Sequence, residues 1–344
     1  MSGSRRVVVQ TGRPLPPLSW QDEVREVPHV WPQLAPQWLA AASAAVDRWT
    51  PWHTVAERGR GEWALLPGFV LAEPESLSID LGSHHIDESA FPVLVLGSPL
   101  GRCSDVAYSF WTPRLYESML RAVVADAGGV GVRSVLAPWV PDRQGSDALT
   151  HAMVDAGARA VSGGRWAHAA PPTDPPSDVD VHKDGDITTF DSPNLHHVLP
   201  QLCELIAAHR GAAAGRPQAV HTLLERLAAA DVDLCGAIAY RDGHPVAAGV
   251  AVHKSHHLFV PFLGAPDHNE RDACLRAILA DRFSRTDSPA LRSIELSAPL
   301  DDSTVLPGAR PRDLTTALLV LDESTRSRVY AELDESTDTA PAVI

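Results

Sequence analysis

The sequence predicts an α+β protein built from two similar halves, each with a largely antiparallel sheet flanked by helices. Three observations lead to this prediction. The chain has 344 residues, which corresponds to two domains at roughly 100–200 residues each. Each half shows the same order of patterns, in which helices come first and antiparallel strands, a helix and a strand follow. A Pro- and Asp-rich segment lies between the halves and is typical of an exposed connection.

The first half begins with a helix pattern at Pro36, where Trp38, Leu39, Ala42 and Val46 share one face. Pro51 ends this helix. Aromatic and branched residues then predict two strands on either side of a Gly-rich turn at 57–61. The patterns predict strands at 52–56, 63–71, 91–97, 104–111 and 132–140, and helices at 113–127 and 146–156.

The second half contains the clearest hairpin, with strands at 234–241 and 245–253 around Asp242-Gly243. Helices are predicted at 195–208, 217–230 and 271–282, and further strands at 256–263, 293–297 and 315–321. The predicted organisation is an irregular arm at 1–30, a first domain at 31–166, a connection at 167–190, a second domain at 191–322 and a polar tail at 323–344.

Charge and composition exclude several classes of protein. The chain has 29 basic and 43 acidic residues and a formal net charge of −14, so a protein that coats DNA through a basic surface is excluded. No apolar run approaches the roughly 20 residues of a membrane span, and no membrane partner is expected. The four cysteines form no CxxC pair and are typical of free thiols in a reducing compartment. We therefore expect a cytoplasmic protein, and the composition indicates a bacterial gene.

Several stretches resemble the GNAT-fold acyltransferase superfamily in duplicate, and most closely the Fem-type (FemAB-like) aminoacyl and acyl transferases of actinobacteria. The segment QWLAAASAAVDRWTPWHTVAERGRGEWALLPGFVL resembles the opening helix and strands of that family. The segment RAVVADAGGVGVRSVLAPWVPDRQGSDALTHAMVDAGARAV resembles its helix, buried strand and short helix. The segments at 234–283 and 294–321 resemble the second-domain hairpin, packing helix and final strands. The resemblance thus implies tandem GNAT-like domains.

The resemblance implies an acyltransferase that moves an acyl or aminoacyl group from a thioester or ester donor to a small amine acceptor. The donor would be acyl-CoA, such as acetyl-CoA, or aminoacyl-tRNA, and no permanently bound cofactor is implied. The amine would attack the carbonyl in a cleft between the halves, where backbone N–H groups of a splayed central strand hold the oxyanion. The sequence leaves the oligomeric state open.

The sequence departs from these families where donors bind. The loop at 264–270 has one glycine, a proline and two acids, whereas a phosphate-binding loop needs free backbone N–H groups. A basic helix between the halves is missing, as is a lysine before Gly308, and these absences, with the acidic net charge, disfavour tRNA. They favour an alternative function, a non-catalytic GNAT-like binding or partner protein that has lost the donor site.

Three residues are candidates for catalysis. Glu295 lies between Ile294 and Leu296 in a predicted strand, so alternation places it on the opposite face. It is a general base if that face lines the cleft, and an ordinary polar strand residue if the face is solvated. His53 is a second candidate base, and Tyr240 could protonate the leaving group or merely flank the turn after it.

Further candidates would bind substrate. Trp52 and Trp63 could line an acceptor pocket around His53, or they could fill the core while His53 faces water. Arg310 and Arg312 could bind an anionic group of the acceptor or cofactor, or lie in a solvated turn. Lys254 is a candidate substrate-binding residue within the VHKSHH segment.

The histidines of that segment, His253, His256 and His257, are expected to be exposed at a hairpin tip. No third ligand at a fixed spacing accompanies them, so no metal is predicted. Neither a G-x-S-x-G nucleophile motif nor a phosphate-binding or dinucleotide-binding glycine loop occurs.

Overall fold

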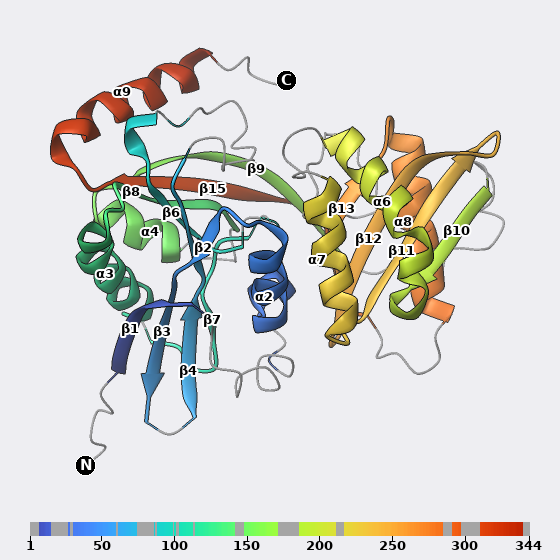
Figure 1. Ribbon diagram of the computed structural model, residues 1–344, viewed down its shortest axis with the longest axis horizontal. Coiled ribbons are helices and arrows are strands. Elements are labelled where there is room, and N and C mark those ends of the chain that lie inside the picture. The colour runs from blue at the N-terminus through green and yellow to red at the C-terminus, as the bar shows by residue number, and fades with distance from the viewer. Residues whose placement is uncertain are drawn as a thin grey trace. The chain divides into compact units, whose positions relative to one another are not determined.

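The structure is a computed structural model, and the chain divides into two compact units, residues 1–164 with 313–344 and residues 165–312 (Figure 1). The predicted α+β class is confirmed. The structure describes residues 7–14, 27, 30–59, 61–73, 86, 88–98, 100, 103–112, 114–141, 148–170, 186–210, 217–284, 291–296 and 310–339, with the side chains of 163–166, 209–210, 268, 284, 312 and 335–339 left aside.

The first unit contains two sheets. One has the strand order β1-β3-β4-β7, and the other has the order β15-β8-β6-β5-β2 within this unit. All pairings given for these strands are antiparallel except β6 with β8, which is parallel. The strands are β1 (Val7–Arg13), β2 (Trp49–Pro51), β3 (His53–Arg58), β4 (Glu62–Leu66), β5 (Gly68–Leu71), β6 (Val93–Leu96), β7 (Ala107–Tyr108), β8 (Ser134–Pro141) and β15 (Arg310–Val320).

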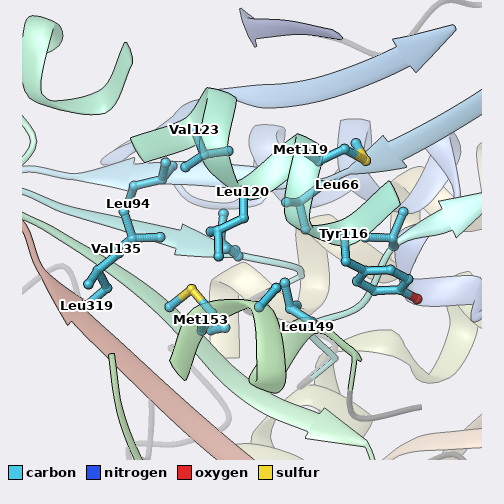
Figure 2. Close-up of a cluster of buried hydrophobic side chains, with 14 of the residues drawn as sticks. Leu66, Leu94, Tyr116, Met119, Leu120, Val123, Val135, Leu149, Met153 and Leu319 are labelled. Atoms are coloured by element: carbon cyan, nitrogen blue, oxygen red, sulfur yellow. The ribbon is translucent and has the colours of Figure 1, made fainter. Parts of the chain in front are cut away.

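The α-helices described for the first unit are α2 (Pro36–Ala45), α3 (Leu115–Ala127), α4 (Ala148–Asp155) and α9 (Glu323–Thr339). The apolar stripe predicted for 113–127 lies on α3, where Met119, Leu120 and Val123 are buried. Together with Leu149 and Met153 of α4 they pack on β6, β8 and β15 (Figure 2). Burial of each large apolar side chain contributes about 1.5–3 kcal/mol, so this contact anchors α3 and α4 to the sheet.

The second unit has one sheet, β10-β11-β12-β13-β14, which continues to the C-terminal end of β9. Helices α6 and α7 lie on one face, and α8 on the other (Figure 1). Cys274, Leu275, Ile278 and Leu279 of α8 form the core of that second face. The elements are β9 (Arg159–Ala169), β10 (Asp186–Asp191), α6 (Leu195–Arg210), α7 (Pro217–Ala229), β11 (Leu234–Arg241), β12 (His244–Lys254), β13 (His257–Gly264), α8 (His268–Ser284) and β14 (Ser293–Leu296).

The predicted hairpin at 234–253 is confirmed. Strands β11 and β12 pair antiparallel from Leu234↔Val252 to Arg241↔His244. Asp242 and Gly243 both have positive φ, at 53° and 76°, as a two-residue hairpin turn requires. Among the described residues, no helix is both long enough and apolar enough to cross a membrane.

Each unit contains a parallel pair of strands in which the second strand begins with a serine that follows an arginine. In the first unit Val93 of β6 pairs with Ser134 of β8, and in the second His257 of β13 pairs with Ser293 of β14. An arginine precedes each of these serines. One residue further along, Leu94 pairs with Val135 in the first unit and Leu258 pairs with Ile294 in the second. These four residues are buried in the cores formed with α3 and α8, respectively. The two units can therefore be compared position by position.

Several predicted boundaries were wrong. The arm at 1–30 contains β1, which pairs with β3 along Val7–Gln10. The connection at 167–190 contains the end of β9 and most of β10. Residues 313–322 belong to the first unit, because β15 pairs with β8 from Leu314↔Pro141 to Val320↔Ser134.

The tail predicted at 323–344 contains α9. Asp322 precedes this helix and accepts hydrogen bonds from the Thr325 N–H, at 3.1 Å, and the Ser324 hydroxyl, at 2.6 Å. These bonds lower the pKa of Asp322 to about 2. The cap provides an acceptor for an N–H group of the first turn. Val329 and Leu333 form the buried side of the helix.

Candidate functional site

Glu295, the predicted general base, lies on β14 in the second unit and contacts a histidine from the neighbouring strand. Its Oε1 is 2.7 Å from Nδ1 of His168 on β9, its register partner. The side chain of Glu295 is 6% exposed, whereas that of His168 is 38% exposed. A carboxylate only accepts hydrogen bonds, so His168 donates from Nδ1 and keeps a lone pair on Nε2. This pair, the His168–Glu295 dyad, has the arrangement of a general base oriented by a carboxylate.

A second histidine lies on the other side of β14. His257 of β13 pairs with Ser293, and its Nδ1 is 2.6 Å from the Ser293 Oγ. Because side chains two residues apart on a strand share a face, Ser293 and Glu295 lie on the same face of β14. Lys254, the register partner of His257 on β12, lies on that face too. The face opposite α8 thus carries two histidines, a lysine and a carboxylate.

His257 lies in a positive environment. Burial lowers its pKa, and the charges of nearby bases lower it further, those of His256, Lys254, Arg292 and His168. A base that stays neutral near pH 7 can take part in hydrogen bonding with Ser293 without carrying charge.

The first unit has apolar residues at the equivalent positions. Leu136 of β8 stands where Glu295 stands, Val93 where His257 stands, and Leu318 of β15 where His168 stands. All three are at most 3% exposed. The polar set is therefore a property of the second unit and is not a general requirement of the fold.

His53 does not fit the role of a general base that the sequence suggested. The residue lies on β3 in the first unit, is completely buried, and its Nδ1 accepts a hydrogen bond from the Gly68 N–H at 3.1 Å. Burial lowers its pKa to about 4. The one lone pair of the neutral ring is thus already used, and the alternative that His53 faces water is wrong as well.

Trp52 and Trp63, expected near an acceptor pocket, are core residues. Trp63 is 1% exposed, and Trp52 packs in the same apolar cluster as α3. The open alternative, in which these tryptophans fill the core, is the one that agrees with the structure.

Tyr240 is far from the dyad along the sheet. Leu234, Val252, Phe259 and Glu295 form one row of paired residues across the strands. Tyr240 lies six residues beyond Leu234 on β11, which is about 20 Å at ~3.3 Å per residue. Its hydroxyl donates to Gln201 Oε1 at 2.9 Å. This placement does not support a role as the acid for the leaving group.

The two arginines predicted to bind an anion lie at the start of β15. Arg310 is exposed, and the side chain of Arg312 lies outside the described residues. No contact given for the described residues joins Arg310 to the dyad, so its role stays a prediction.

His253, expected at an exposed tip, is 9% exposed instead. Its Nδ1 lies 3.0 Å from Asp233 Oδ2, and Arg282 of α8 contacts both residues. Burial raises the pKa of Asp233, but hydrogen bonds from His253 and Arg282 outweigh this and leave the pKa below its usual value. Across the described residues, no three His, Cys, Asp or Glu side chains converge in a way that could hold a metal ion.

The N-terminus of α8 carries its own acidic cap. The Oδ1 of Asp267 accepts hydrogen bonds from the N–H groups of Asn269 and Glu270, at 2.9 and 3.2 Å. Glu270 is 5% exposed and pairs with Arg241. These carboxylates occupy the end of the helix where a phosphate would otherwise bind, as the sequence of the loop indicated.

We expect the Asp267 cap to make a measurable contribution to the stability of the second unit. Replacing Asp267 by Ala should destabilise the second unit by about 1 kcal/mol, because two N–H groups lose their acceptor. Asp267→Asn keeps an acceptor oxygen and should cost less. Urea unfolding followed by circular dichroism compares the two variants, and equal stability of Asp267→Ala and the wild type would contradict the assignment of the cap.

In the first unit, the space between β6 and β8 beyond their last paired residues, Val95 and Leu136, is occupied by a segment of the chain itself. The Ser104 Oγ is 2.7 Å from the carbonyl oxygen of Leu96 on β6 and also contacts that of Pro138 on β8. A Cβ on Gly97 would lie 2.3 Å from the Cys103 carbonyl oxygen. No open slot for an acyl chain remains at this point.

The segment that fills the slot is held by a buried carboxylate. Asp105 is 5% exposed. It accepts hydrogen bonds from Tyr116 OH at 2.9 Å, Trp31 Nε1 at 3.2 Å and the Val106 N–H at 2.7 Å. Three donors compensate the cost of burying this charge, so the closed slot is a well-supported part of the fold.

Comparison with solved structures identifies the fold. A tandem GNAT protein from the clavulanic acid biosynthesis pathway superposes with a TM-score of 0.53 at 10% identity, covering 92% of this chain and 99% of that one. The chain has a tandem GNAT fold. The structure of L-PGS from Bacillus licheniformis is also similar, with a TM-score of 0.46 at 12% identity over 87% of this chain and 96% of that one.

Comparisons of sequence add no relative. No protein-family model matches the chain, and no curated protein matches it either. The tandem GNAT fold therefore rests on the structure, and the resemblance to Fem-type enzymes in particular stays a prediction.

Proposed function

We propose that the protein is an acyltransferase whose second unit moves an acyl or aminoacyl group from a thioester or ester donor to a small primary amine. The observation that carries this proposal is the His168–Glu295 dyad on the sheet face opposite α8. The tandem GNAT fold supports it, and the dyad lies where β14 pairs with β9 at one end of the unit's sheet. The four cysteines are buried and form no disulfide with one another, which agrees with a place in the cytoplasm.

The residues support a direct transfer. The amine nitrogen attacks the carbonyl carbon of the donor, a C–N bond forms, and the C–S or C–O bond to the leaving group breaks. The proton that the amine loses passes to Nε2 of His168, and Glu295 stabilises the resulting imidazolium through Nδ1. The thiolate or alkoxide that leaves takes up a proton in turn. His168, which no pattern in the sequence indicated, is thus the proposed base, and Glu295 is the residue that positions it.

The donor is constrained by α8. Asp267 and Glu270 repel phosphate at the N-terminal end of this helix. If acyl-CoA is the donor, its pyrophosphate therefore binds away from the N-terminus of α8. Aminoacyl-tRNA meets a chain of net charge −14, which opposes its phosphates. Both donor classes therefore belong in the test.

The second candidate function is a non-catalytic binding protein that keeps the tandem fold. The closed slot in the first unit and the acidic cap of α8 favour this function, because each occupies a place where a donor could bind.

The deciding experiment incubates the purified chain with acetyl-CoA or with aminoacyl-tRNA and a panel of small primary amines, and detects acylated amines by mass spectrometry. We expect acylated product with one donor class and a much lower yield with His168→Gln. A protein that acylates no amine with either donor, and that binds neither donor in calorimetric titrations, is the non-catalytic protein instead.

A further inference from the structure

Basic side chains gather where the β12–β13 turn meets the start of β14. Lys254 ends β12, and His256 and His257 follow through a tight turn in which Ser255 has a φ of 57°. The Arg292 N–H donates to the His256 carbonyl oxygen at 2.7 Å, so the residue before β14 lies against the turn. We call Lys254, His256, His257 and Arg292 the basic rim.

The rim places two strongly basic side chains, Lys254 and Arg292, beside His256 and His257 in a protein that is acidic as a whole. The charged groups that act on His257 are all bases, and they come from the end of β12, the turn, the residue before β14, and β9. Glu295 lies two residues from Ser293 on this face of the sheet and is bonded to His168. The chain as a whole has a net charge of −14, so a local excess of cations is a feature of this place. Such an excess attracts an anion.

Two members of the rim, Lys254 and His257, lie on the same face as the dyad at a neighbouring level, and His256 and Arg292 adjoin them at the turn and before β14. Ser293, which contacts His257, precedes Glu295 by two residues on β14, a separation of about 7 Å. A small molecule can therefore contact both. We infer that the amine acceptor carries an anionic group, a carboxylate or a phosphate, which binds at the basic rim while the amine lies at His168. This inference rests on the proposed function for the amine end only.

The first unit supplies a control for the rim. Leu71 of β5 pairs with Val93 as Lys254 pairs with His257, so two members of the rim are apolar there. Arg133, in contrast, precedes Ser134 as Arg292 precedes Ser293. Both arginines are exposed. Arg133→Gln therefore makes the same change in charge at the equivalent position of a unit that lacks the rest of the rim.

The direct test is anion binding without catalysis. Sodium acetate and inorganic phosphate are titrated into the full-length protein, and the imidazole signals of His257 are followed by NMR, with His257→Asn used for assignment. We expect saturable shifts that weaken about tenfold in Arg292→Gln, as loss of one charged hydrogen bond implies, and that persist in Arg133→Gln. The tighter of the two anions indicates the group that the acceptor carries. Shifts that do not saturate, or that weaken equally in both variants, overturn the inference.

A paired-acceptor assay separates this inference from the proposed function. The donor that supports transfer is tested with two acceptors, 4-aminobutyrate and 4-aminobutanamide, in which an uncharged amide replaces the carboxylate. Preference for the acid by the wild type, lost in Arg292→Gln, supports the rim as the anion site. Equal rates for acid and amide, together with no saturable anion binding, overturn the inference and leave acyl transfer standing. If the protein binds anions saturably but has no transferase activity, the basic rim is supported as an anion site and the proposed function is contradicted.

Discussion

Replacing His168 by Gln is expected to lower the rate of acyl transfer by roughly 10²–10⁴-fold, the usual contribution of a general base. Gln has no basic nitrogen that could accept the amine proton, although it keeps a polar side chain on β9. Glu295→Gln should give a smaller loss, because the imidazole remains and only its orientation and charge stabilisation weaken. The rate is measured with the donor and amine that give product in the wild type.

Two controls distinguish a chemical role from a structural one. Adding imidazole to His168→Ala should restore part of the rate, because the side chain is 38% exposed and the vacated space is open to small bases. His196→Gln removes an exposed histidine from α6 in the same unit and should leave the rate unchanged. A His168→Ala variant that is folded, inactive and insensitive to imidazole would show that His168 is not the base.

The sequence predicted the helices and strands that have strong hydrophobic periodicity. It did not predict the strands that are built from small or polar residues. The stripe of α3 and the Asp242-Gly243 hairpin are local patterns, and both are present as predicted. Strand β9 ends in Ala167, His168 and Ala169, which provide little apolar signal. Its stability comes from pairing with β14, a partner more than 120 residues away in sequence. A single sequence does not reveal such a register.

The candidate site was predicted in part for the same reason. Glu295 follows from the alternation around Ile294 and Leu296, both buried core residues, so its face could be derived locally. The contact that gives Glu295 a chemical role is with His168 on β9, and the nearby contact of Ser293 is with His257 on β13. Both depend on which strands flank β14. His53 shows the opposite error, because a histidine in a strand with tryptophan neighbours resembles a site until its complete burial is known.

The first unit is expected to lose roughly 3 kcal/mol of stability between pH 7 and pH 4 through His53 alone. In the folded chain, burial lowers the pKa of His53 from 6.5 to about 4. In the unfolded chain, the ring takes up a proton as the pH falls through 6.5, so the unfolded state binds more protons in this window. The contribution is therefore fully present above pH 6.5 and is lost as the pH falls to about 4. At 1.36 kcal/mol per pKa unit, the shift corresponds to the stated loss.

Urea unfolding at a series of pH values measures this effect. Eight of the nine tryptophans lie in residues 1–164, so tryptophan fluorescence follows mainly the first unit. His53→Gln should be less stable than the wild type at pH 7, because the Gly68 N–H loses its acceptor, yet its stability should depend less on pH between 6.5 and 4. His151→Gln, an exposed substitution on α4, controls for the loss of a histidine as such. Parallel pH profiles for His53→Gln and the wild type would show that the ring is protonated in the folded state and that its burial is not what makes this unit acid-sensitive.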